Sequence, residues 1–91
     1  MKVFEFRSDI SDVVDNSEPF LDIETELFLS KSKAIDYMIS KALKYEKANK
    51  GANFYRNVKD YPKDSETIEL ESYRCCDVFG IFCVTEKEII E

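Results

Sequence analysis

Residues 26–45 read ELFLSKSKAIDYMISKALKY, and this stretch decides the fold. It opens on a short apolar run and then reaches Ser30 and Ser32, each suited to cap the first turn of a helix. Apolar side chains then recur in pairs four residues apart and form one stripe: Ala34, Ile35, Met38, Ile39, Ala42 and Leu43. The stretch predicts a strand over residues 24–29 and an amphipathic helix that ends in a left-handed cap at Asn49 or Gly51.

Two other segments alternate apolar and polar residues with the period of a half-buried strand. Residues 2–8, KVFEFRS, place Phe4 and Phe6 on one face. Residues 66–73, ETIELESY, place Ile68 and Leu70 on one face and acidic or hydroxyl side chains on the other. We expect both segments to be strands that cover one side of the core.

A fourth strand is predicted at residues 78–85, VFGIFCVT, which are apolar on both faces. Such a run is typical of a central strand, and Gly80 within it indicates a bulge or close packing against the helix. The intervening residues 50–65 form a polar loop whose aromatic side chains we expect to pack under a sheet edge rather than bind nucleic acid.

The alternation is broken over residues 9–23. Here we expect Ser8 to cap a short helical turn that carries Ile10, Val13 and Val14, before Pro19 stops any helix. The order of principal elements is then β-β-α-β-β. This order predicts a single α+β domain over residues 1–91, in which one amphipathic helix packs on a four-stranded antiparallel sheet.

Composition excludes several function classes. No apolar run approaches the roughly 20 residues that span a bilayer, and the charged N-terminal residues do not resemble a signal peptide. We therefore expect a soluble, cytoplasmic protein with no membrane partner. The chain has two glycines, too few for a glycine-rich phosphate-binding loop. It has no histidine, the usual general base near neutral pH. We expect neither catalysis nor a cofactor.

The three cysteines are Cys75, Cys76 and Cys83. Their odd number makes a poor disulfide framework, and a closed zinc site normally needs four cysteine or histidine ligands. We expect reduced thiols, with at least one packed as a small core side chain. A small thiol redox or metal-binding protein remains as an alternative.

Charge is segregated along the chain although the net charge is only −6. Residues 1–30 hold two basic and eight acidic side chains, a net charge of −6. Residues 31–59 hold eight basic and two acidic side chains, a net charge of +6. Residues 60–91 hold three basic and nine acidic side chains, again −6. A lysine-rich helix face and an acidic sheet face are therefore expected, either for solubility alone or for steering a partner.

The second interpretation supplies a candidate binding surface on the acidic side of the sheet. Carboxylates spaced along a rigid strand can imitate the phosphates of a nucleic acid, and an exposed aromatic adds contact area. The residues expected to bind the partner are Glu24, Glu26, Asp60, Asp64, Glu66, Glu69, Glu71 and Tyr73. The expected partner is a basic nucleic-acid-binding protein or nuclease complex, without direct contact to nucleic acid.

The run ELFLSKSKAIDYMISKALKY and the acidic strand pair after it resemble small orphan proteins of phages and mobile elements. Some of those are inhibitors of host defence, including anti-CRISPR proteins. The resemblance lies in size, acidity and layout, and it implies a stoichiometric binder, monomeric or homodimeric. The main alternative is a self-associating structural or regulatory module, because a free sheet edge can pair with a second copy.

Overall fold

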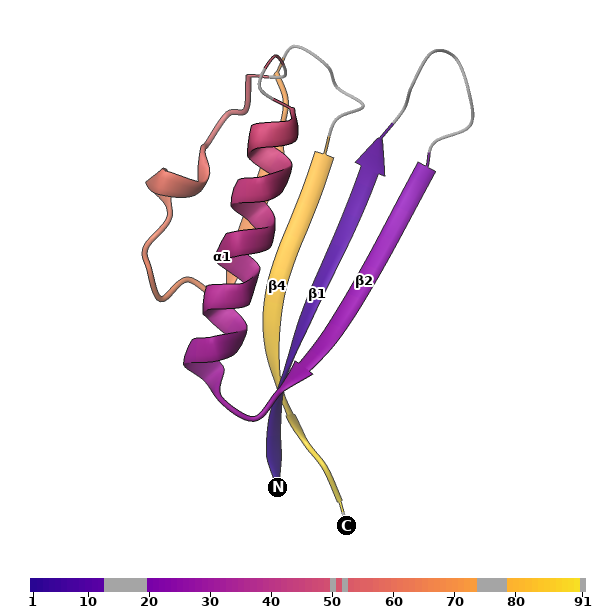
Figure 1. Ribbon diagram of the computed structural model, residues 1–91, viewed down its shortest axis with the longest axis vertical. Helices are drawn as coiled ribbons and strands as arrows, with labels where there is room; N and C mark the ends of the chain where they lie inside the picture. The colour runs from indigo at the N-terminus through magenta and orange to yellow at the C-terminus, as the bar shows by residue number, and fades with distance from the viewer. Residues whose placement is uncertain (13–19, 50, 52, 74–78, 91) are drawn as a thin grey trace.

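The computed structural model describes residues 1–12, 20–49, 51, 53–73 and 79–90. The sheet has the order β2-β1-β4-β3, and each neighbouring pair is antiparallel (Figure 1). The elements are β1 (Lys2–Asp12), β2 (Phe20–Phe28), α1 (Lys31–Ala48), a 3-10 helix (Val58–Asp60), β3 (Thr67–Glu71) and β4 (Phe79–Glu88). The predicted α+β fold, with one helix on a four-stranded antiparallel sheet in the order β-β-α-β-β, is confirmed.

The helix α1 begins at Ser30, whose hydroxyl oxygen accepts the backbone N–H of Lys33 at 3.4 Å. It ends at Asn49, whose backbone N–H donates to the carbonyls of Tyr45 and Glu46. The Asn49 side chain donates to the Tyr45 carbonyl as well, at 2.9 Å. The predicted left-handed cap is wrong: Asn49 has φ of −119°, and neither glycine has a positive φ. These hydrogen bonds satisfy the carbonyls of Tyr45 and Glu46 without a left-handed residue.

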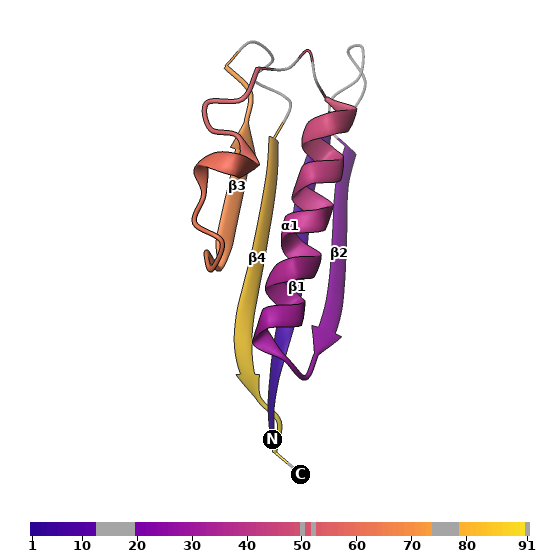
Figure 2. The ribbon, with the colours of Figure 1, turned by 60° about the vertical axis from the view of Figure 1, so that its left-hand side comes forward.

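The helix lies along one face of the sheet and leaves the other face uncovered (Figures 1 and 2). The predicted stripe supplies its buried side, through Ala34, Ile35, Met38 and Ala42. From the sheet, alternate residues point toward this stripe, and the largest fully buried side chains are Phe6, Phe82, Met38, Ile68 and Leu70. The predicted inward orientation of Ile68 and Leu70 is confirmed, as is the central position of the fourth strand.

At Gly80 the helix and sheet approach closely, as expected. A Cβ atom on this residue would lie 3.0 Å from Cε1 of Tyr45 and 3.1 Å from Cε2 of Phe82. Tyr45 packs against both Phe82 and Phe54, with ring centroids 5.8 Å and 6.0 Å apart. The absence of a side chain at Gly80 therefore makes room for the Tyr45 ring in the core.

Strand β1 is longer than expected, and the helical turn predicted after Ser8 is wrong for the described residues. Residues 8–11 continue the strand because they pair on both sides; Ile10, for example, lies opposite Asp22 of β2 and Gly80 of β4, and Asp12 pairs with Phe20 of β2. Strand β2 likewise begins at Phe20 rather than at residue 24. The predicted positions of Val13, Val14 and Pro19 lie outside the described residues.

Candidate interaction surface

Glu69 and Glu71 lie on the face of β3 that points away from the helix. They alternate with Ile68 and Leu70, which are buried under α1, so both carboxylates are exposed. Among the described residues neither carboxylate forms an ion pair. The sequence prediction for these two residues therefore agrees with their position on an accessible strand face.

Tyr73, the predicted aromatic contact, lies just beyond β3 and is 56% exposed. Its ring packs against Tyr55, which is 69% exposed, with centroids 5.5 Å apart. Two exposed tyrosines thus stand next to the end of the strand that carries Glu69 and Glu71. We call these four residues the β3 patch: Tyr55, Glu69, Glu71 and Tyr73.

Backbone hydrogen bonds hold the two tyrosines in place. The N–H of Tyr55 donates to the carbonyl of Glu71 at 3.0 Å, and the N–H of Tyr73 donates to the carbonyl of Asn53 at 3.1 Å. Phe54 and Ser72 form the bridge between these two bonds, and both are buried. The backbone of both tyrosines is therefore fixed at the end of β3.

The same loop closes the outer edge of β3. The Tyr61 hydroxyl donates to the carbonyl of Glu69 at 2.8 Å and accepts the N–H of Glu69 at 3.2 Å. The Ser65 hydroxyl donates to the carbonyl of Thr67 at 2.7 Å. Sequence reasoning expected loop aromatics near a sheet edge but did not identify the roles of Tyr55 and Tyr61. Both depend on register, which the loop sequence alone does not indicate.

Three other predicted contact residues lie in or beside this loop. The Asp60 carboxylate accepts the backbone N–H of Asn57 at 2.9 Å and so caps the 3-10 helix. Glu66 pairs with Lys31 at the start of α1. Asp64 is exposed. Asp60 and Glu66 thus organise the loop and the helix start, and they differ from Glu69 and Glu71 in already having partners.

Glu24 and Glu26 lie on the opposite side of the sheet from the β3 patch. Glu26 stands opposite Phe6 in the register and Glu24 opposite Ser8, so both are on the helix side. Glu24 accepts the Tyr37 hydroxyl at 2.8 Å and the Lys41 ammonium at 3.2 Å. The eight predicted residues therefore do not form one surface, because strand alternation puts β2 and β3 carboxylates on different faces.

The contacts of Glu24 perturb three ionisable groups. The hydrogen bond from Tyr37 is the largest effect and lowers the pKa of Glu24 below its ordinary value of 4.5; desolvation opposes it, and the hydrogen bond from Lys41 lowers the pKa further. The hydrogen bond to Glu24 in turn raises the pKa of Tyr37 and of Lys41. Glu24 is thus a carboxylate that is already engaged by the helix.

The uncovered sheet face carries charges of both signs. Arg7 pairs with Asp9 at 3.2 Å, and Lys87 pairs with Glu5 at 3.1 Å. The sheet face that the sequence predicts to be acidic thus also carries two basic side chains, Arg7 and Lys87, and each of them is paired with a carboxylate. The helix does expose lysines as predicted, at Lys33, Lys44 and Lys47, whereas Lys41 folds down onto Glu24.

An open cleft of about 600 Å³ lies beside the C-terminal part of α1. Its lining includes Tyr73 of the β3 patch and Lys47 of the helix. Glu46, also in the lining, accepts the backbone N–H of Val58 at 2.7 Å, so this carboxylate links the helix to the loop. The cleft thus lies between the loop and the helix, and Glu46, the acidic residue among its described lining, already has a hydrogen-bond partner.

Cys83 lies on the uncovered sheet face and is half-buried. Burial raises the pKa of its thiol above the ordinary value of 9.0, which leaves it protonated and weakly nucleophilic near neutral pH. Cys75 and Cys76 lie outside the described residues. Within the described chain, no three metal-binding side chains come together.

No protein-family model, curated protein or solved structure matches this chain significantly. Among the described helices, none combines the length and apolarity needed to cross a bilayer.

Proposed function

We propose that this protein is a non-enzymatic interaction protein, a stoichiometric inhibitor or regulator whose β3 patch docks on a basic surface of a nucleic-acid-handling protein. The observation that carries the proposal is the state of Glu69 and Glu71. Both are exposed and without an ion pair among the described residues, whereas Glu5, Asp9 and Glu24 are each paired. Two carboxylates are thus available to a partner at a fixed separation.

The geometry of the patch suits a surface that binds anions. Alternate residues on a strand are separated by about 7 Å, so Glu69 and Glu71 form a short, regular row of negative charge. A nucleic-acid strand offers a similar regular row of anions to the same lysines and arginines. Arginine side chains also stack on tyrosine rings, which Tyr55 and Tyr73 supply beside the carboxylates. The net charge of −6 favours approach to a basic protein and disfavours approach to nucleic acid itself.

The test requires a partner and then a matched pair of variants. The protein is immobilised, exposed to nuclease-treated lysate and eluted in salt steps, and each purified candidate is titrated by calorimetry. The double variant E69K/E71K reverses two charges on the patch. Its control, E86K/E88K, makes the same change of net charge at the end of β4 that β3 does not reach.

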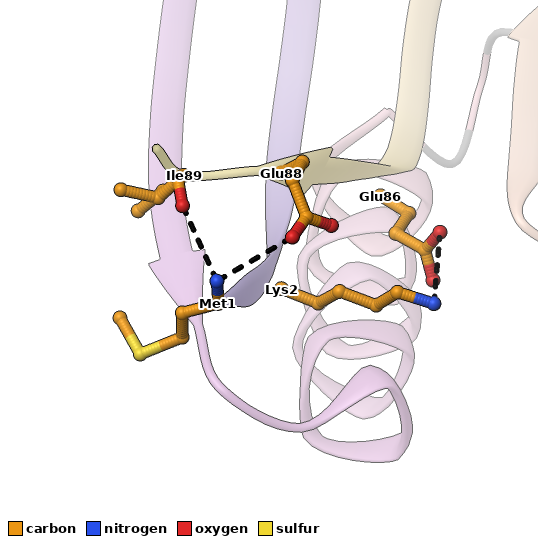
Figure 3. Close-up of polar contacts among 5 residues, drawn as sticks. All are labelled: Met1, Lys2, Glu86, Glu88 and Ile89. Carbon is orange, nitrogen blue, oxygen red and sulfur yellow. Dashed lines mark hydrogen bonds and ion pairs between the residues drawn. The ribbon is translucent and has the colours of Figure 1, made fainter. Parts of the chain in front are cut away.

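Figure 3 shows why the control carboxylates differ from those of the patch. Glu88 pairs with the N-terminal amine of Met1 at 3.5 Å, and Glu86 pairs with the Lys2 ammonium at 4.0 Å. Both pairs are exposed and contribute little to stability, so the control protein should remain folded. We expect E69K/E71K to weaken binding by at least about tenfold and E86K/E88K to change it far less. An equal loss of affinity in the two variants, or an affinity that does not fall as the salt concentration rises, would contradict the proposal.

A further inference from the structure

The two edges of the sheet differ in whether their outward backbone groups have hydrogen-bond partners. At β3 the outward carbonyls of Thr67, Glu69 and Glu71 accept hydrogen bonds from Ser65, Tyr61 and Tyr55, and the N–H of Glu69 donates to the Tyr61 hydroxyl. At the other edge β2 is the terminal strand, and no described segment lies beyond it (Figures 1 and 2). A terminal strand with free backbone groups is a template for another strand.

The direction of each β2 backbone group follows from the ladder. Met1 and Ile89 exchange two hydrogen bonds: the N–H of Ile89 donates to the carbonyl of Met1 at 2.8 Å. The Met1 amine donates to the carbonyl of Ile89 at 3.2 Å, as Figure 3 shows. Because bonded pairs alternate in antiparallel strands, the odd residues of β1 bond to β4 and its even residues bond to β2. In the register of β1 with β2, even residues pair with even residues.

The odd residues of β2 therefore direct their N–H and carbonyl groups outward. These residues include Ile23, Thr25 and Leu27, and none of the outward backbone groups of these three bonds to a described residue. The same alternation, applied to β3, places the groups of Glu69 outward, where Tyr61 bonds them. The observed contacts at β3 thus support the assignment at β2.

The side chains at this open edge differ between its two faces. On the uncovered face Ile23 is 49% exposed and Leu27 is 57% exposed. On the helix side the strand carries Glu24 and Glu26. Lys41 already neutralises part of the charge of Glu24, so Glu26, which has no ion pair among the described residues, is the stronger anchor for a cation.

A second copy of the chain is a poor occupant of this edge. Only odd residues present outward groups, so antiparallel self-pairing must set even residues opposite even residues. The registers with fullest overlap then place Glu24 opposite Glu24, Glu24 opposite Glu26, or Glu26 opposite Glu26 of the other copy. Like charges directly opposite each other destabilise a strand pair. The edge is complementary to a strand of opposite charge, not to itself.

We propose that β2 receives an extended segment of a partner protein as a fifth strand, and that this segment alternates basic and aliphatic residues. Its lysines or arginines lie on the helix side against Glu24 and Glu26. Its aliphatic side chains lie on the uncovered face against Ile23 and Leu27. Main-chain hydrogen bonds to residues 23, 25 and 27 supply affinity, and the two side-chain rows supply specificity. This proposal uses the edge opposite the β3 patch and does not depend on the function proposed for that patch.

The direct test is an NMR titration of the isotope-labelled full chain with a nine-residue peptide in which lysine alternates with valine. We expect shift changes centred on residues 23–27 and new exchange protection of the amides of Ile23, Thr25 and Leu27. A peptide of the same composition, with its lysines and valines in separate blocks, should bind at least about tenfold more weakly because it cannot place the two rows on opposite faces. Equal binding of the two peptides would overturn the proposal.

Variants locate the site. Thr25→Pro removes an outward donor and blocks a fifth strand, and Leu27→Lys removes an apolar contact and adds a repelling charge. Each should weaken peptide binding at least about tenfold. Leu27→Lys keeps the test valid if the proline variant fails to fold. Its matched control is Leu43→Lys on α1, where the side chain is 47% exposed, and this variant should bind as the unmodified protein does.

Charge reversal separates this proposal from the previous one. Glu26→Lys should weaken peptide binding about three- to tenfold, whereas Glu71→Lys should leave it nearly unchanged. If Glu71→Lys weakens peptide binding and Glu26→Lys does not, the basic segment binds the β3 patch. That result would overturn the β2 proposal and leave the proposed function of the β3 patch standing. A dimer detected by light scattering and dissolved by Leu27→Lys would assign the edge to a second copy and would also overturn it.

Discussion

The hydroxyl of Tyr61 both donates to the carbonyl of Glu69 and accepts its N–H, at 2.8 Å and 3.2 Å. One side chain thereby takes the place of a neighbouring strand at the middle of β3. Natural sheets cover their edges in this way to prevent unwanted pairing. At β2, by contrast, residues 23–27 have no such cover among the described residues, and the proposed addition of a fifth strand requires this open edge.

Removing this hydroxyl should loosen the β3 edge. Tyr61→Phe deletes two hydrogen bonds that lie near solvent, so we expect a loss of about 0.5–1.5 kcal/mol in the free energy of unfolding, measured by urea denaturation. Amide exchange at Glu69 should accelerate as well. Tyr55→Phe is the matched control, since Tyr55 bonds β3 through its backbone N–H. Equal destabilisation by both variants would show that the Tyr61 hydroxyl has no special role.

The contacts of Glu24 should make stability depend on pH in a defined window. Its pKa is lowered in the folded protein by the hydrogen bonds from Tyr37 and Lys41, so folding favours the ionised carboxylate. The resulting stabilisation is complete above the unfolded-state pKa, near 4.5, and is lost as pH falls through the lower folded-state value. Glu24→Gln should therefore flatten the acid limb of the unfolding free energy. Glu26→Gln is the control, and an equal flattening by both would contradict this account.

Gly80 should not accept a side chain. In Gly80→Ala the new Cβ meets the Tyr45 ring at 3.0 Å, within a packed group that includes Phe82. We expect a destabilisation of about 1–3 kcal/mol, measured by thermal or urea unfolding. Gly51→Ala is the control, because a Cβ there meets nothing within 4 Å and the backbone has no positive φ. That variant should be neutral or slightly stabilising.

The link from Glu46 to Val58 should hold the loop against the helix. The Glu46 carboxylate accepts the Val58 N–H at 2.7 Å in a partly buried setting. Glu46→Ala leaves that N–H without its partner, which should cost about 1–3 kcal/mol in the free energy of unfolding. Lys47→Ala, an exposed neighbour on the same helix, should have little effect. A similar loss in both variants would indicate a general effect on the helix.

The sequence predicts the parts of this fold that depend on local periodicity. The stripe from Ala34 to Ala42 and the alternation at Ile68 and Leu70 repeat often enough to indicate both the element and its buried face. The apolar run around Phe82 likewise indicates a central strand, and β4 does lie between β1 and β3, although its second apolar row, Ile81 and Cys83, lies on the face that α1 leaves uncovered. These patterns can be read from the sequence because the hydrophobic effect places apolar side chains on the buried face of each element.

Long-range pairing decides what the sequence left undetermined. Residues 8–11 carry a weak alternation, and they are strand because both β2 and β4 pair with them. The predicted binding residues separate for the same reason: the register that places Glu26 opposite Phe6 puts it on the helix side, away from Glu69. The role of Tyr61 also requires register, since its hydroxyl acts on a backbone group eight residues away.

The most direct test of the central claim, one closed edge and one open edge, is amide hydrogen exchange of the free protein measured by NMR at residue resolution. We expect fast exchange at Ile23, Thr25 and Leu27, slow exchange at Glu24 and Glu26, and protection at Glu69 by Tyr61. Protection of the three odd residues of β2 equal to that of Glu24 and Glu26 would show that this edge is already covered and would contradict the account.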